Sequence, residues 1–342
     1  MPCSPLPAAD LEHILASTAP LWHELQGARL FITGGTGFWG RWLLESIKSA
    51  NEKLGAKLMV TVLSRDPNRF RAAMPHLRDR DEFDWLSGET ANFRFPCGHY
   101  DFVFHLATAS AAELRAAHPA LAIATLVGTQ RVIDFARMCG AQRLLLASSG
   151  AVYGRQPADM FRIPEDYGGG PNPQDAASAY GEVKRLSELF CAASPDLECI
   201  IARGFSFVGP HLPLTDKFAV GGFFRDAIAG GPILIHGDGR PSRAYLYAAD
   251  LVIWLLVLLL RGKPNRPYNV GSDQAVCLAD LATEIALAAE CPEIKILGLR
   301  TTESCDRYTP EISRARDELG LTVLIPRPEA LARTLAWIRQ AQ

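Results

Sequence analysis

Three glycines between a short apolar run and a helical pattern constrain the fold of this chain more than any other feature. The apolar run covers residues 28–33, the glycine-rich motif covers 33–40, and a helical pattern follows over 41–49. Glycine lets a backbone turn sharply and approach a pyrophosphate without a Cβ clash. The N-terminus of the helix then offers free N–H groups to the anion. This order predicts a dinucleotide-binding loop that holds the pyrophosphate with Gly34, Gly37 and Gly40.

Strand-like and helix-like stretches alternate along the first two hundred residues. The strand candidates span residues 28–33, 57–63, 101–107, 143–148 and 198–202. Such alternation predicts an α/β fold with a Rossmann-type doubly wound parallel sheet. Beyond about residue 210, glycines and prolines interrupt the pattern, which predicts a smaller and more irregular C-terminal α/β lobe.

The 342 residues allow about two folding units. We expect an N-terminal extension over residues 1–27, with one helix over 8–25. A NAD(P)-binding Rossmann domain over 28–205 and a substrate-binding lobe over 206–342 would follow. Some strands of this lobe could return to the Rossmann sheet.

Composition argues against several classes of partner. The net charge of −2 disfavours nucleic acid or an anionic membrane as the main partner. The most apolar run, over 251–260, is too short to span a bilayer and predicts a buried helix. The N-terminus lacks a signal-peptide pattern, so we expect a cytoplasmic protein. The eight cysteines include no C-x-x-C pair, so we expect free thiols and no metal site.

The end of the second strand candidate selects the cofactor. An acidic residue at this place binds the ribose 2′-hydroxyl of NAD. This chain instead has Ser64 and Arg65 there, followed by Arg69. Because a guanidinium binds a phosphate in bidentate fashion, these residues favour NADP over NAD. The alternative is a solvated loop in which Asp66 neutralises Arg65.

A tyrosine and a lysine four residues apart supply the candidate chemistry. Tyr180 and Lys184 open a helical pattern and lie on one face of it, and Ser149 ends a strand candidate. A phenol is a poor base at neutral pH, but a nearby ammonium and the positive nicotinamide ring both favour its phenolate. Tyr180 could then take a proton from a substrate hydroxyl while hydride leaves the same carbon. Lys184 would bond the nicotinamide ribose, and Ser149 the reacting oxygen.

Together these motifs resemble the extended short-chain dehydrogenase/reductase family, in particular its NAD(P)-dependent nucleotide-sugar epimerases and dehydratases. The resemblance runs from about residue 28 to 320, in the order of the family. The segments that carry it are 33–40, 105–107, 148–154, 180–184, 203–210, 237–239, 243–247 with Asp250, 268–271, 306–308 and 319–320. As a set, they specify the family much more closely than the reaction.

The resemblance implies a role for each residue that matches a family motif. The catalytic triad would be Ser149, Tyr180 and Lys184. The cofactor side would comprise Gly34, Gly37, Phe38, Trp39, Gly40, Ser64, Arg65, Arg69, Glu89, Leu106, Ala107, Tyr180 and Lys184. The substrate side would comprise Ser149, Tyr153, Ser206, Arg243, Asn269 and Arg307. Arginines suit the two phosphates of a nucleotide-diphosphate sugar.

The resemblance also implies a homodimer formed through two helices of each subunit. The candidate helices span residues 119–139 and 180–193. We therefore expect a nucleotide-diphosphate sugar and a second copy of the chain as the partners of this protein.

Two positions depart from the family in a way that bears on the reaction. By resemblance, sugar 4,6-dehydratases carry an aspartate and a glutamate directly after the catalytic hydroxyl, and UDP-glucuronate decarboxylases need the glutamate. Here Gly150 and Ala151 occupy these positions, and neither side chain can move a proton. Thr125 and Ser206 stand where many members have asparagine, which affects substrate binding and not the hydride step.

What remains is oxidation and reduction at a sugar carbon without elimination, in carbohydrate biosynthesis. We expect a nucleotide-sugar epimerase (an isomerase) in which Tyr180 removes a hydroxyl proton, at C4, and the resulting ketone takes hydride back on its other face. The alternative is an NADPH-dependent 4-ketoreductase with the same triad. A 4,6-dehydratase or decarboxylase is less favoured, and so is a non-catalytic NADP-binding regulator, because such proteins tend to lose the tyrosine or the lysine.

Overall fold

The chain divides into two units in the computed structural model, which describes residues 3–116, 119–216, 218–290, 293–299 and 306–341. Unit 1 comprises Met1–Gly154, Gly169–Gly204 and Val252–Tyr268. Unit 2 comprises Arg155–Gly168, Phe205–Leu251 and Asn269–Gln342. The N-terminal extension therefore belongs to unit 1, and the stretch after residue 251 returns to it.

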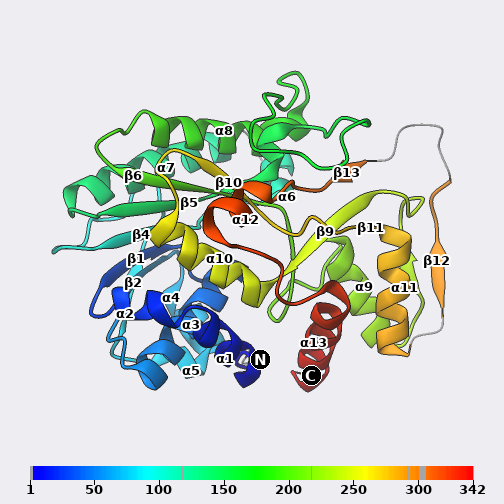
Figure 1. The fold of residues 1–342 in the computed structure, drawn as a ribbon, viewed down its shortest axis with the longest axis horizontal. Coiled ribbons are helices and arrows are strands. Elements are labelled where there is room, and N and C mark those ends of the chain that lie inside the picture. The colour runs from blue at the N-terminus through cyan, green and yellow to red at the C-terminus, as the bar shows by residue number, and fades with distance from the viewer. Residues whose placement is uncertain (1–2, 117–118, 217, 291–292, 300–305, 342) are drawn as a thin grey trace. The chain divides into compact units, whose positions relative to one another are not determined.

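A seven-stranded sheet forms the frame of unit 1, in the order β10-β6-β5-β4-β1-β2-β3 (Figure 1). The strands are β1 Arg29–Thr33, β2 Met59–Ser64, β3 Phe83–Ser87, β4 Phe102–His105, β5 Arg143–Ser149, β6 Glu198–Gly204 and β10 Pro267–Val270. Neighbouring strands from β3 to β6 are parallel. This order is that of a doubly wound Rossmann sheet, so the predicted fold class is confirmed.

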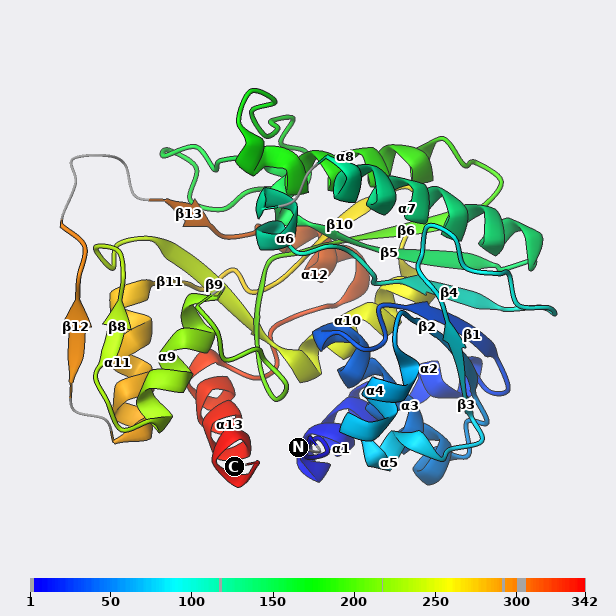
Figure 2. The same ribbon diagram turned by 180° about the vertical axis from the view of Figure 1, so that it is seen from behind.

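Helices cover both faces of this sheet (Figures 1 and 2). One face carries α7 Ala120–Met138 and α8 Ala179–Ala192, and α6 Ala111–Ala116 packs against α8. The other face carries α1 Ala8–Ser17, α2 Ala19–Glu24, α3 Phe38–Leu54, α4 Pro67–Ala73, α5 Pro75–Arg78 and α10 Ala248–Arg261. Two short 3-10 helices, η1 Gly150–Tyr153 and η2 Ala176–Ser178, stand after β5 and before α8.

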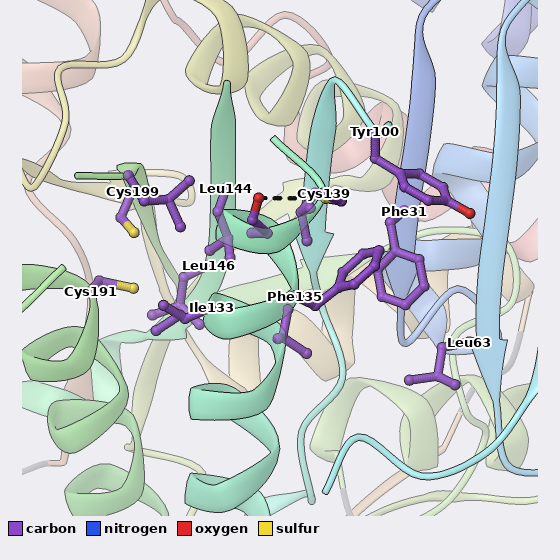
Figure 3. Close-up of a cluster of buried hydrophobic side chains, with 14 of the residues drawn as sticks. Phe31, Leu63, Tyr100, Ile133, Phe135, Cys139, Leu144, Leu146, Cys191 and Cys199 are labelled. Carbon is purple, nitrogen blue, oxygen red and sulfur yellow. Dashed lines mark hydrogen bonds between the residues drawn. The ribbon is translucent and has the colours of Figure 1, made fainter. Parts of the chain in front are cut away.

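A cluster of buried side chains fixes α7 and α8 against the sheet (Figure 3). Phe31 of β1 lies within it, with its ring centroid 4.5 Å from that of Phe135 in α7 and 5.5 Å from that of Phe93. Tyr100 meets Phe31 edge-on at 5.8 Å. Tilted, offset and edge-on contacts are the arrangements that aromatic quadrupoles favour. The packing therefore fixes the position of α7 on the central strands of the sheet.

Strand β9, Ser242–Tyr247, is the centre of unit 2. It pairs with β7 Ser206–Val208 and β13 Arg307–Tyr308 in parallel, and with β11 Ala275–Cys277 in antiparallel fashion. A separate parallel pair joins β8 Ile233–Ile235 to β12 Ile294–Ile296. The helices of this unit are α9 Ala219–Ile228, α11 Leu278–Ala289, α12 Ser313–Leu319 and α13 Arg327–Gln340.

Two elements differ from the sequence predictions. The single helix predicted over 8–25 is two helices that meet at Thr18, because Pro20 lacks the N–H that would continue the first helix. Strand β3 was not predicted, since its sequence, Phe-Asp-Trp-Leu-Ser, lacks a continuous apolar run.

The long apolar run predicted as a buried helix lies inside α10. Over the residues that the structure describes, no helix combines the length and the apolar character needed to cross a bilayer. Six of the eight cysteines lie within the described residues as free thiols, and Cys291 and Cys305 lie outside them.

Candidate functional site

The glycine loop passes from β1 to α3 in close contact with the end of β4. Gly34 has a φ of +73°, and a Cβ at this position would lie 2.5 Å from the backbone nitrogen of Ala107. A Cβ on Gly40 would lie 2.3 Å from the Cα of Gly35. Both positions therefore require glycine. The loop presents bare backbone beside the N-terminus of a 17-residue helix, and this combination fits the pyrophosphate of a dinucleotide.

His105, the last residue of β4, is buried and links the glycine loop to helix α7 through two hydrogen bonds. Its Nδ1 lies 2.8 Å from Thr33 Oγ1, and its Nε2 lies 3.1 Å from Thr129 Oγ1. The Thr129 hydroxyl donates to the carbonyl of Thr125, so it accepts from His105 Nε2, and Nδ1 then accepts from Thr33. Burial lowers the pKa of His105 to about 3, which keeps the ring neutral. Because Thr33 Oγ1 also accepts from the N–H of Ala107, the chain of bonds fixes the end of β4 at the loop.

Ser149, Tyr180 and Lys184 come together where α8 lies against the end of β5. Tyr180 and Ser149 share a side-chain hydrogen bond, and Lys184 Nζ lies 5.9 Å from the centroid of the tyrosine ring. Lys184 is buried, and its Nζ donates to the carbonyl of Ala147 at 2.5 Å. The three side chains thus form one cluster of hydroxyl, phenol and ammonium.

Burial controls the charges in this cluster. It raises the pKa of Tyr180, although the hydrogen bond to Ser149 acts in the opposite direction. Burial also lowers the pKa of Lys184 to about 8, against the effect of the Glu188 carboxylate, which raises it. Near neutral pH the lysine is mostly an ammonium, while the tyrosine keeps its proton until a further positive charge approaches it.

A partly buried ion pair adjoins the cluster. Glu188 of α8 accepts from Arg203 Nη2 at 2.6 Å and from Ser148 Oγ at 2.5 Å. Arg203 Nη1 donates to the hydroxyl of Tyr153 at 2.8 Å, so this tyrosine serves the ion pair. Glu188 was not predicted as a site residue, although its spacing of four residues from Lys184 puts it on the same helical face.

The residues predicted to hold the cofactor stand at the carboxyl ends of successive parallel strands. Ser64 ends β2, Glu89 follows β3, and Leu106 and Ala107 follow β4. Phe38 and Trp39 begin α3 after the glycine loop. In doubly wound sheets ligands bind at this edge, next to the point where the strand order reverses. Here that point lies between β1 and β4.

The basic residues after β2 flank a helix cap. Asp66 is the N-cap of α4, and its Oδ1 accepts from the backbone nitrogen of Arg69 at 3.0 Å. Arg65 stands exposed just before this cap. The alternative in which Asp66 neutralises Arg65 has to compete with this capping bond.

A pocket of about 460 Å³ lies within unit 2 and contains Arg307, one of the predicted substrate residues. Arg307 Nη1 donates to the carbonyl of Ala158, and its guanidinium lies 4.7 Å from the Phe161 ring centroid. Two further arginines, Arg162 and Arg240, line the same pocket. The other lining residues are Ser242, Asp273, Gln274, Ala275 and Thr309.

Sequence reasoning missed these two arginines. Arg240 directly follows the 237–239 turn, which was a usable signal, but Arg162 stands in a loop-like stretch without a motif. Arg162 pairs with Asp273 at 3.5 Å, and Arg240 pairs with Asp238 at 2.5 Å.

The other predicted substrate residues of unit 2 are engaged in its packing. Arg243 pairs with Asp306 at 2.6 Å. Asn269 is fully buried, and its Nδ2 donates to the carbonyls of Ile163 and Glu311. Ser206 begins β7. Substrate contacts of these three residues stay predictions.

Comparison with known proteins identifies the family. The model of the NAD-dependent epimerase/dehydratase family matches residues 30–271, which is more than half of the chain. The chain belongs to this family. The predicted resemblance to extended short-chain dehydrogenases/reductases of the nucleotide-sugar epimerase and dehydratase type is thereby confirmed.

Curated relatives of this family member include decarboxylases. UDP-glucuronic acid decarboxylase 1 of Xenopus tropicalis is 28% identical over 322 residues, which cover 93% of this chain and 73% of that protein. UDP-glucuronic acid decarboxylase 6 of Arabidopsis thaliana is 27% identical over 85% of this chain and 83% of its own length.

Solved structures of other enzymes share the fold. A UDP-N-acetylglucosamine 4-epimerase of Methanobrevibacter ruminantium superposes with a TM-score of 0.80 at 19% identity, covering 93% of this chain and all of that chain. DesIV of Streptomyces venezuelae, a dTDP-glucose 4,6-dehydratase solved with NAD bound, gives a TM-score of 0.76 at 22% identity, covering 91% and 97%. At these identities the similarity establishes the fold of this chain and does not identify its reaction.

Proposed function

We propose that this chain is a nucleotide-sugar epimerase that acts by transient oxidation at C4 of the sugar, with Tyr180 as both base and acid. The observation that carries the proposal is the set of side chains at the end of β5. Ser149, Tyr180 and Lys184 form a proton-handling cluster, while Gly150 and Ala151, in η1, offer no carboxylate beside it.

The chain's own residues move and hold the proton. Tyr180 takes the proton of the substrate hydroxyl as its carbon is oxidised and returns it when the carbon is reduced. The Lys184 ammonium lowers the cost of the phenolate. Ser149 donates a hydrogen bond to the reacting oxygen. Because Lys184 is buried, its ammonium stabilises the Tyr180 phenolate more strongly than it would in water.

The bare backbone of the glycine loop supports a dinucleotide cofactor. Gly34 and Gly40 leave no room for a Cβ, and the N-terminus of α3 supplies free N–H groups for the pyrophosphate. Bound NAD(P) would supply the redox chemistry by accepting a hydride from a carbon and returning it. We propose NADP in preference to NAD, because β2 ends in Ser64 and not in a carboxylate, and Arg65 and Arg69 follow it.

The substrate that we propose is a nucleotide-diphosphate sugar. Guanidinium groups of Arg162, Arg240 and Arg307 in the pocket of unit 2 suit phosphate oxygens. The decarboxylase relatives carry UDP-glucuronic acid in their name. We do not propose decarboxylation for this chain, because by family resemblance that reaction needs a glutamate where Ala151 stands.

A 4-ketoreductase is the second candidate, and the Ser64–Arg65 pair favours it. A reductase consumes NADPH at each turnover, and a basic strand end suits the 2′-phosphate of that donor. Tyr180 would donate the proton to the carbonyl oxygen as the carbon is reduced, with Ser149 and Lys184 in the same roles as in the epimerase.

We further propose a homodimer formed through α7 and α8. These helices pack against each other, and each leaves large apolar side chains in solvent. Ile123 and Val127 of α7 are 60% and 48% exposed, and Leu189 of α8 is 58% exposed.

An assay of the purified chain with nucleotide sugars separates the candidate reactions. An epimerase interconverts 4-epimers without a net change in absorbance at 340 nm, while a reductase oxidises NADPH in proportion to product. Release of CO₂ from UDP-glucuronic acid would contradict the proposal.

Replacement of the tyrosine tests the assignment of the acid and base. Tyr180→Phe removes the hydroxyl, so we expect turnover to fall by at least about 100-fold, the contribution typical of general acid–base catalysis. Tyr100→Phe is the matched control, because it removes a buried hydroxyl that bonds only within the core, to Thr61 at 2.9 Å. Equal activity of Tyr180→Phe and Tyr100→Phe would refute the role of Tyr180.

A further inference from the structure

Helix α8 contacts three successive residues of β5 through side chains spaced four residues apart. Tyr180 bonds Ser149, and Lys184 Nζ donates to the carbonyl of Ala147 at 2.5 Å. One turn further on, Glu188 accepts from Ser148 Oγ at 2.5 Å. Residues at this spacing lie along one face of a helix. Glu188, which contacts Ser148, therefore lies on the same face of α8 as Tyr180 and Lys184.

Glu188 is held by hydrogen bonds from two strands of the sheet, β5 and β6. Its carboxylate accepts from Arg203 Nε at 2.9 Å and Nη2 at 2.6 Å as well as from Ser148. The side chains of Glu188 and Arg203 are only 12% and 13% exposed. Arg203 is in turn held by the hydroxyl of Tyr153. This network fixes a full negative charge inside the protein, one helical turn from Lys184.

The charge acts on Lys184, which is otherwise disfavoured as an ammonium. The ionisable groups that interact with the lysine are Tyr180 and Glu188 on α8 and His105 on β4. Arg203 on β6 pairs with Glu188. His105 is neutral, and Tyr180 is a neutral phenol at rest. Arg203 is positive and cannot stabilise a second cation. Glu188 is therefore the charge among these groups that favours the protonated lysine.

We propose that Glu188 is a positioning residue for the reaction, which keeps Lys184 an ammonium next to Tyr180 and holds the Ser148–Ser149 end of β5 against α8. Glu188 touches no substrate in this scheme and acts through Lys184 and Ser148. The proposal rests on the proposed function for the meaning of the reaction, but the charge of Lys184 can be measured without any substrate.

The test is the titration of Lys184 in Glu188→Gln, which keeps the shape of the side chain and removes its charge. The chain has only seven lysines, so heteronuclear NMR of protein labelled at lysine can follow each side chain, with Lys184→Arg assigning the signal. We expect a wild-type midpoint near 8 and a midpoint about one pH unit lower in Glu188→Gln, because an attractive charge has been lost. An unchanged midpoint in the folded variant would overturn the proposal.

Ser148→Ala is the matched control, because it removes the hydroxyl donor and leaves the carboxylate in place. We expect the midpoint of Lys184 to stay at the wild-type value in this variant; a fall as large as that in Glu188→Gln would refute the charge argument. If Glu188→Gln fails to fold, the double variant Glu188→Gln/Arg203→Gln replaces the ion pair by two amides, a change that buried ion pairs often tolerate. A downward shift is still expected there, but a smaller one, because the positive charge of Arg203 is removed together with the negative charge of Glu188.

The pH dependence of turnover links this charge to the reaction. In Glu188→Gln we expect kcat to fall while KM changes little, and the alkaline limb of the profile to move to lower pH by the same interval as the NMR midpoint. An alkaline limb that stays in place while the lysine midpoint moves would overturn the positioning role. A moved midpoint in a protein whose wild type converts no nucleotide sugar would instead uphold the charge coupling and count against the proposed function.

Discussion

At the scale of single residues, burial decides which groups of unit 1 carry charge. Desolvation disfavours the charged form of every ionisable group, so it lowers the pKa of His105 and Lys184 and raises that of Tyr180. For Lys184, the Glu188 carboxylate offsets part of the desolvation, and the lysine remains mostly protonated near neutral pH. His105 has no carboxylate among the causes of its pKa shift and is neutral. Lys184 is therefore a source of positive charge, and His105 is a neutral link in a chain of hydrogen bonds.

The neutral state of His105 predicts a specific sensitivity to acid. The folded-state pKa of His105 is about 3, below the ordinary 6.5, so the unfolded chain binds the extra proton as the pH falls below 6.5. The stability contribution is therefore complete above pH 6.5 and is lost progressively towards pH 3. Between pH 7 and pH 5 we expect a loss of about 2 kcal/mol from this residue.

Urea unfolding of His105→Asn checks this prediction. The variant cannot titrate, so its loss of stability between pH 7 and pH 5 should be smaller than that of the wild type by about this amount. At pH 7 the variant should be less stable by roughly 1–3 kcal/mol, because the hydroxyls of Thr33 and Thr129 lose a partner. The same loss in both proteins between the two pH values would show that folding does not lower the pKa of His105.

At the scale of elements, the packing of α3 onto the glycine loop sets the shape of the proposed cofactor site. A Cβ on Gly40 would lie 2.3 Å from Gly35 Cα and 2.4 Å from Gly34 O, and both are backbone atoms that have no rotamer to change. Gly40→Ala should therefore displace the loop and weaken NADP(H) binding by at least tenfold. The strain should also lower stability by about 1–3 kcal/mol.

The control for this prediction is Gly168→Ala, since a Cβ there meets nothing within 4 Å. Fluorescence titration with NADPH measures the affinity, and thermal unfolding measures the stability. If Gly40→Ala bound NADPH as tightly as Gly168→Ala, the loop would not be the pyrophosphate site.

The elements that could be predicted from sequence are those whose signal is local. The glycine motif, the apolar strands β1, β5 and β6 and the helices α7 and α8 each combine a continuous pattern with a clear end, and the structure has them within a few residues. Strand β3 has no such pattern, because only Phe83 is buried in it. The N-terminal helix is divided at Thr18 because of Pro20. The apolar pattern of residues 8–25 continues through this proline, so the pattern alone does not predict the break.

Parts of the site escaped prediction for a different reason. Tyr180 and Lys184 could be found because their spacing has a chemical meaning, but Glu188 gains its role from Arg203, a residue on another element. Arg162 acquires a place in the unit 2 pocket only through the fold of a loop. Contacts of this kind depend on tertiary structure, so one sequence without relatives does not reveal them.

At the scale of the whole molecule, the chain passes repeatedly between its two units. Residues 155–168 leave unit 1 just after η1, and the chain returns to unit 1 at Val252, in the first turns of α10. The cluster of Ser149, Tyr180 and Lys184 belongs to unit 1, and the arginine-lined pocket belongs to unit 2. Each unit can be tested separately, by cofactor titration for the first and by nucleotide-diphosphate titration for the second.

The exposed apolar face of α7 and α8 predicts the assembly of the molecule. Ile123 and Val127 lie one turn apart on α7, and Leu186 and Leu189 lie one turn apart on α8, all in solvent in the single chain. Such a patch on two packed helices is the kind of surface that a second copy covers. Because Tyr180 and Lys184, the proposed catalytic residues, belong to α8, a dimer would also restrain them.

Light scattering of a variant with a charge on each helix decides whether the dimer exists. We expect the wild type at twice the chain mass of 37.3 kDa and the double variant Ile123→Glu/Leu189→Glu at the mass of one chain, since a buried unpaired carboxylate opposes association. Leu287→Glu is the control, because Leu287 is 75% exposed on α11, in unit 2, and should leave the dimer intact. A wild type that elutes as a single chain would refute the dimer, whereas a double variant that stays dimeric would place the interface elsewhere on the molecule.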